Sequence, residues 1–179
     1  MTITNIDYQK QVRELFSKVN REGFDKLQYY LIRNGYLTAK GSTKYHSNFK
    51  GGLLEHSLLV YKLFKEMCIR YNIDLSEESI IIVSLLHDAC KVLIHKDKYK
   101  KYNGHGLLSL QMIEKFIVLT KIEREIIRFH MGIYSSWEYD KTLGEFPIIQ
   151  YVNITNEYPV IKLFNMADDI SATFLERRV

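Results

Sequence analysis

Helical spacing of apolar residues is the feature that most narrowly constrains how this chain can fold. An apolar stripe with the period of an α-helix runs from Leu53 to about Tyr71, and a second apolar helix is predicted from about Leu75 into His87-Asp88. The same spacing predicts helices over residues 8–20, 24–34, 105–118, 120–131 and 158–175. No segment alternates between apolar and polar residues as a half-buried strand would. The sequence therefore predicts an all-α fold.

Local signals predict where several helices begin and end. Asp74 with Glu77, and Thr120 with Glu123, have the spacing of a capping box, in which two side chains satisfy free amides in the first turn of a helix. Gly35 is placed to end a helix in the left-handed conformation. The connecting segments are predicted to be loops, and long loops in small domains are commonly functional. They are residues 36–50, the lysine-rich 91–103, and the aromatic 133–156, which is either a long loop or a weakly structured lid.

Ionisable residues interrupt the apolar faces of three predicted helices. They are His56, His87, Asp88 and Asp168. A carboxylate is costly to bury unless it is paired or bound to a metal. Helix bundles build metal sites from imidazoles and carboxylates that project inward from several helices. A single buried histidine is commonly an ordinary core residue, so the prediction of a metal site depends on the four residues taken together.

Five short motifs carry a resemblance to a known family. They are GGLLEHS (51–57), LLHDACK (85–91), GHG (104–106), IRFH (127–130) and MAD (166–168). In this order they resemble the HD superfamily of metal-dependent phosphohydrolases, over roughly residues 46 to 175. The first two motifs look especially like the HD domains of certain 3′–5′ exoribonucleases and like small HD-domain proteins of phages and bacteria.

The resemblance implies a single-domain, HD-type helical bundle that holds one or two divalent ions. Residues 51–179 would form its core, with residues 1–50 as N-terminal helices packed against it. Manganese, iron, nickel, zinc and magnesium are the ions expected. Six residues match the metal ligands of the family: His56, His87, Asp88, His105, His130 and Asp168.

Two of these assignments have alternatives. His105 and His130 match the ligands of a second metal in some members of the family, and residues that contact the substrate phosphate in others. Asp168 follows Ala167 as in the family's motif, whereas its neighbour Asp169 is turned about 100° away around the helix. Asp168 is therefore the predicted ligand.

The resemblance also implies hydrolysis of a phosphoester by a metal-activated water. The expected substrate is of the nucleotide type: a mononucleotide, a cyclic dinucleotide or an oligonucleotide. Asp88 and Lys91 are the predicted catalytic residues, although Ala89-Cys90 stands where the family's usual Ile-Gly precedes this lysine. The predicted substrate-binding residues are Lys91, His105, His130, Tyr134 and Trp137, the last two as aromatic side chains that could stack on a base or form a hydrophobic flap.

Three other functions remain in view. Di-iron oxygenases of the HD fold have the same six-ligand pattern, and oxygen consumption by iron-loaded protein would distinguish them. A 3′–5′ exonuclease acting on single-stranded RNA or DNA ends is another alternative, although no separate RNA-holding domain is recognisable. A non-catalytic helical module is disfavoured because all six ligand positions are present.

Composition excludes several further classes. Cys68 and Cys90 form no CxxC pair, so neither a disulfide framework nor a cysteine-ligated zinc site is indicated. The formal net charge of +4 is too small to indicate binding of duplex DNA, and the lysine-rich stretch is either a solvated loop or a contact for a phosphorylated ligand. Neither a signal peptide nor a membrane-spanning run is evident. We therefore expect a cytoplasmic protein without a membrane partner.

Overall fold

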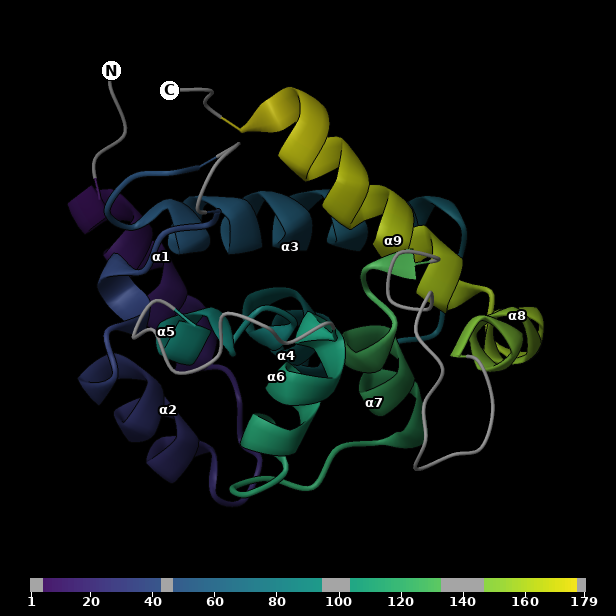
Figure 1. Cartoon of the computed structure of the whole chain (residues 1–179), viewed down its shortest axis with the longest axis horizontal. Coiled ribbons are helices and arrows are strands. Elements are labelled where there is room, and N and C mark those ends of the chain that lie inside the picture. The colour runs from purple at the N-terminus through teal and green to yellow at the C-terminus, as the bar shows by residue number, and fades with distance from the viewer. Residues whose placement is uncertain (1–4, 43–46, 95–103, 133–146, 177–179) are drawn as a thin grey trace.

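Helix α3 (Gly52–Arg70) is the element around which the other helices are arranged. It contacts α1 (Asn5–Phe16), α4 (Glu77–Leu86) and α9 (Val160–Ile170), and Figure 1 shows α9 crossing over it. Every residue from Gly52 to Leu58 is buried, so the first two turns of α3 are enclosed on all sides. A side chain of any type that projects from these turns must find its partners inside the protein.

The computed structural model describes residues 5–42, 47–94, 104–132 and 147–176. Within these ranges every regular element is a helix, which confirms the predicted all-α, single-domain fold. None of the helices described there is long and apolar enough to cross a bilayer. The remaining elements are α2 (Phe24–Arg33), the 3₁₀ turn η1 (Tyr36–Thr38), α5 (Lys91–Ile94), α6 (His105–Ile113), α7 (Lys121–Arg128), α8 (Pro147–Glu157) and the π-helical turn η3 (Ser171–Leu175).

Helix α4 is a buried apolar rod that ends at His87. It is buried from Ser79 to Leu86 and packs on α3 and α7. Its N-cap is Ser76, whose hydroxyl accepts a hydrogen bond from the backbone amide of Ser79 at 3.1 Å. The predicted cap at Asp74 with Glu77 is therefore wrong, because Ser76 immediately precedes the first helical residue and occupies the capping position itself.

The capping box predicted for α7 is confirmed. The Thr120 hydroxyl accepts from the amide of Glu123 at 3.3 Å, and the Glu123 carboxylate accepts from the amide of Thr120 at 2.7 Å. The pairs Asp74/Glu77 and Thr120/Glu123 have the same spacing in the sequence. Only the second pair caps a helix, because Ser76 lies directly before α4 and caps it in place of Asp74.

The prediction of a loop or lid over residues 133–156 is wrong for its second half. Residues 147–157 form α8, which packs on α9, and residues 133–146 lie outside the described ranges. Tyr151, Ile154 and Tyr158 pack against the core at helical spacing. The predicted loop at 91–103 likewise begins with the short helix α5, and that at 36–50 with η1.

The end of the last helix also differs from the prediction. A single helix over 158–175 would place Leu175 on the same side as Asp168, but α9 ends at Ile170 and the chain continues as the π-helical turn η3. Leu175 is 48% exposed, whereas the next residue, Glu176, is 6% exposed. The physical reason is that a π turn takes in one more residue than an α turn.

A partly buried ion pair joins the segment between α1 and α2 to the start of α7. The Arg21 guanidinium contacts both carboxylate oxygens of Glu123, at 2.8 and 3.0 Å, and one oxygen of Glu78 at 3.0 Å. Glu123 is 0% exposed. Although burial opposes it, the hydrogen bonds from Arg21 hold the pKa of Glu123 below its usual range. The pair therefore anchors the first turn of α7.

Replacing Arg21 by Ala should lower the free energy of unfolding by about 3 kcal/mol at pH 7, because Glu123 would remain buried without its cation. The folded-state pKa of Glu123 is lowered, so this stabilisation is present above the unfolded-state value of about 4.3 and is lost as pH falls. In urea unfolding, the difference in free energy of unfolding between wild type and Arg21→Ala should thus become smaller between about pH 5 and pH 3. Arg13→Ala, an exposed change on α1, is the control, and an equal effect of both variants at pH 7 would contradict this assignment.

Candidate metal centre

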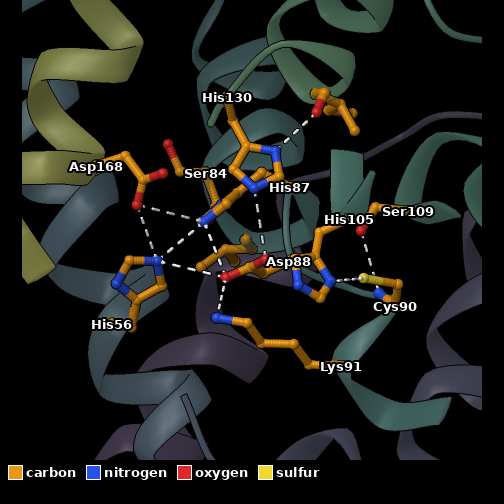
Figure 2. Close-up of polar contacts among 12 residues, drawn as sticks. His56, Ser84, His87, Asp88, Cys90, Lys91, His105, Ser109, His130 and Asp168 are labelled. Carbon is orange, nitrogen blue, oxygen red and sulfur yellow. Dashed lines mark hydrogen bonds and ion pairs between the residues drawn. The ribbon is translucent and has the colours of Figure 1, made fainter. Parts of the chain in front are cut away.

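Five ionisable side chains from four parts of the chain converge beneath α9. His56 projects from α3, His87 and Asp88 follow α4, His130 follows α7, and Asp168 projects from α9 (Figure 2). All except Asp168 are buried, and Asp168 is mostly buried. The structure thus brings together five of the six residues that the sequence predicts as metal ligands.

The contacts within this cluster are short enough for several atoms to share one ion. Two overlapping groups each offer ligand atoms within 4.8 Å of one another, namely His56, His87 and Asp88, and His87, His130 and Asp168. His56 Nε2 lies 3.0 Å from His87 Nε2 and 3.1 Å from Asp168 Oδ1. Asp88 Oδ2 lies 3.7 Å from His56 Nε2 and 3.6 Å from His87 Nε2.

The Nδ1 atoms of the three histidines all have partners outside the cluster. His87 Nδ1 lies 2.9 Å from the carbonyl oxygen of Ser84, and His130 Nδ1 lies 2.8 Å from that of Ile127. A carbonyl oxygen only accepts, so the Nδ1 atoms of His87 and His130 carry the protons. In the neutral rings the lone pair is then on Nε2, which faces the cluster. This is the tautomer that a metal ligand needs.

The surroundings of these Nε2 atoms indicate whether a cation could bind among them. The Nε2 atoms of His56 and His87 lie 3.0 Å apart, so a proton or a metal must lie between or beside them. His130 Nε2 is buried and makes no hydrogen bond within the described ranges, although it lies 3.5 Å from Asp88 Oδ1. A buried polar atom without a hydrogen bond is costly. The nitrogen and oxygen donors present suit a divalent transition metal, so the residues fit such an ion.

The electrostatics of the cluster favour neutral His87 and ionised carboxylates. Burial lowers the pKa of His87 to about 4. Burial opposes the ionisation of Asp88 and Asp168, but neighbouring positive charge outweighs it: Lys91 holds the pKa of Asp88 well below its usual range, and the hydrogen bond with His56 lowers that of Asp168. Burial also opposes protonation of His56, yet hydrogen bonds to Asp168 and Glu176 raise its pKa to about 10.

The other residues predicted for the site are not part of the cluster of five side chains. Lys91 forms an ion pair with Asp88 Oδ2, at the edge of the cluster. His105, the first residue of α6, is half-buried, with Nδ1 3.9 Å from Cys90 Sγ, and it belongs to neither group of candidate ligands (Figure 2). Tyr134 and Trp137 lie outside the described residues. Asp169, the alternative to Asp168, is exposed.

A close helix contact holds α6 beside the cluster. A Cβ atom on Gly106 would lie 2.2 Å from the carbonyl oxygen of Arg128 and 2.6 Å from that of Ile127. Only glycine permits this approach of α6 to the end of α7. The GHG motif thus sets the distance between His105 and the chain that bears His130.

Sequence reasoning missed two residues that contact the cluster from outside. Asn165 donates from Nδ2 to the carbonyl oxygens of Phe129 and His130, at 2.8 and 2.9 Å, and accepts from the Tyr151 hydroxyl at 2.8 Å. Asn165 lies three residues before Asp168, so its position on the same side of α9 was a usable signal. Glu176, whose Oε1 lies 2.5 Å from His56 Nδ1, gave no such signal because the π turn brings it there.

Comparison with known proteins agrees with the order of the motifs. The family model described as HD domain matches residues 53–157, more than half of the 179-residue chain. The match includes His56, the His87-Asp88 pair and His130, whereas Asp168 and Glu176 lie beyond its end. No curated protein and no solved structure gave a match to the chain.

Replacing Asp168 by Asn should weaken Mn²⁺ binding at least about tenfold, since loss of even an outer partner of a metal ligand commonly has that effect. Titration calorimetry on metal-free protein measures the affinity. Asp169→Asn is a matched control, because it makes the same change one residue away on the exposed side of α9. Equal Mn²⁺ affinities of the two variants would remove Asp168 from the site.

Proposed function

Because the chain belongs to the HD domain family, whose members are mostly metal-dependent hydrolases, we propose that it is a phosphohydrolase that cleaves a phosphoester of a nucleotide-type substrate. The observation that carries the proposal is the convergence of three imidazole Nε2 atoms and two carboxylates inside the helical bundle, with His130 Nε2 buried and without a hydrogen bond among the described residues. A donor set of this kind has little structural purpose without a cation.

His56, His87, Asp88 and Asp168 would hold a divalent ion, and His130 would contribute a ligand if a second ion binds. Such an ion, when bound, lowers the pKa of a water molecule and stabilises negative charge on phosphoryl oxygens. The surrounding protein fixes the ligands, because each of the three rings is also held through Nδ1.

Asp88 is proposed to orient the attacking water. Its Oδ2 faces His56, His87 and Lys91, while its Oδ1 lies 3.5 Å from His130 Nε2, so the carboxylate joins the two halves of the cluster. Lys91 holds the pKa of Asp88 well below its usual range, against the effect of burial. A carboxylate with so low a pKa accepts a hydrogen bond but is a poor store for a proton. Asp88 is therefore an orienting group.

Lys91 is proposed to neutralise charge that develops on the phosphoryl group. Burial opposes its protonation, but Asp88 raises the pKa of Lys91 above its usual value, so the ammonium group persists. A firmly protonated lysine stabilises an anionic transition state and is a poor proton donor to the leaving group. Burial lowers the pKa of His105. His105 is thus proposed to contact the phosphate as a neutral imidazole.

The proposal is tested by release of phosphate or nucleoside from mononucleotides, cyclic dinucleotides and short single-stranded RNA. Each substrate is combined with manganese, nickel, magnesium and iron in turn. Hydrolysis of at least one substrate is expected, and Asp88→Asn should abolish it. Lys91→Ala should lower kcat by about 10²-fold to 10³-fold, the usual effect of removing one group that stabilises transition-state charge.

Lys162→Ala is the matched control for Lys91→Ala, because Lys162 is exposed on α9. It should keep wild-type turnover. Release of single nucleotides from RNA ends would identify the exonuclease form of the activity. Absence of hydrolysis with every combination, together with oxygen consumption by the iron-loaded protein, would replace the proposal with a di-iron oxygenase.

A further inference from the structure

We propose that Glu176 is a positioning residue for the metal centre, holding His56 so that its Nε2 faces the ion. Glu176 Oε1 lies 2.5 Å from His56 Nδ1, and Glu176 is buried. The inference rests on the proposed metal site and adds a residue that lies beyond the matched family region.

The path of the chain explains how a residue so near its end reaches α3. Helix α9 and the turn η3 both pack on α3. In a regular α-helix, a residue eight positions after Asp168 would point about 80° away from it. A π turn takes in one extra residue, so Glu176 occupies about the place of the seventh residue, within about 20° of the direction of Asp168. The backbone amide of Glu176 donates to the carbonyl oxygen of Ser171 at 3.0 Å, the i→i+5 bond of this turn.

The consequence is that two carboxylates from one helical segment act on the two nitrogens of one imidazole. Asp168 Oδ1 lies 3.1 Å from Nε2 of His56, and Glu176 lies against Nδ1. Removing the π turn would exchange Glu176 for Leu175, which cannot accept a hydrogen bond. The π turn therefore places a hydrogen-bond acceptor against His56. Turns of this kind inside helices commonly occur at functional sites.

The contact differs from those of the other two histidines. His87 and His130 donate from Nδ1 to neutral backbone carbonyls three residues earlier in their own segments. His56 lies in the second turn of α3, where the preceding carbonyls are engaged in helix hydrogen bonds. A carboxylate from another element is thus the available way to fix its ring. A carboxylate partner also makes the imidazole a stronger donor to a metal than a carbonyl does.

The test compares Zn²⁺ binding by full-length wild type and Glu176→Gln, measured in competition with a chromophoric chelator. Loss of the charged acceptor should lower the Zn²⁺ affinity about tenfold or more. In the Zn²⁺-loaded wild type, the proton on His56 Nδ1 should give a strongly downfield NMR resonance, because its acceptor is a close carboxylate. That resonance should move upfield or vanish in Glu176→Gln. Glu176→Asp, whose side chain is shorter, should not restore it.

Glu123→Gln is the control for a merely structural effect. It removes another buried carboxylate, at the opposite end of α7 from His130, and should lower urea resistance without changing Zn²⁺ affinity. Wild-type Zn²⁺ affinity and an unshifted His56 resonance in Glu176→Gln would overturn this inference alone. Failure of the wild type to bind Zn²⁺ would overturn both the inference and the proposed function.

Discussion

Negative charge buried beside imidazole nitrogens is the constraint on which the structure of this protein depends. Asp88 and Asp168 lie where water has little access, and a carboxylate in such a place requires compensating positive charge. Lys91 compensates Asp88, and His56, whose pKa is raised by Asp168 and Glu176 although burial opposes this, compensates Asp168 when it is protonated. A divalent ion would take over this role for both carboxylates and would displace the proton from His56, which is why metal binding is expected to release protons.

The ends of helices α4 and α7 also fix the orientation of the imidazole rings in the cluster. His87 and His130 lie where α4 and α7 end, and each donates from Nδ1 to a carbonyl near the end of its helix. Carbonyls in the last turn lack intrahelical partners, so one contact satisfies the helix end and fixes the imidazole. The other end of α7 is anchored separately, by the ion pair of Arg21 with Glu123.

Features that depend on local pattern could be predicted from the sequence. Helix α3, the buried helix α4 and the approach of His56, His87, Asp88 and Asp168 follow from helical periodicity and the order of the motifs, and the structure brings these four residues together. Their role as ligands stays a prediction. Features that depend on backbone register and on contacts between helices could not be predicted. The π turn substitutes Glu176 for Leu175, and His105 lies beside Cys90, apart from both groups of candidate ligands.

Anomalous X-ray diffraction from a crystal loaded with Mn²⁺ would show whether an ion binds within the cluster. The expected anomalous peak is bounded by Nε2 of His56 and His87 and by the carboxylates of Asp88 and Asp168, with His56 Nδ1 still bonded to Glu176. Side chains of His56, His87 and Asp168 that point away from one another, or a peak coordinated by other residues, would contradict it.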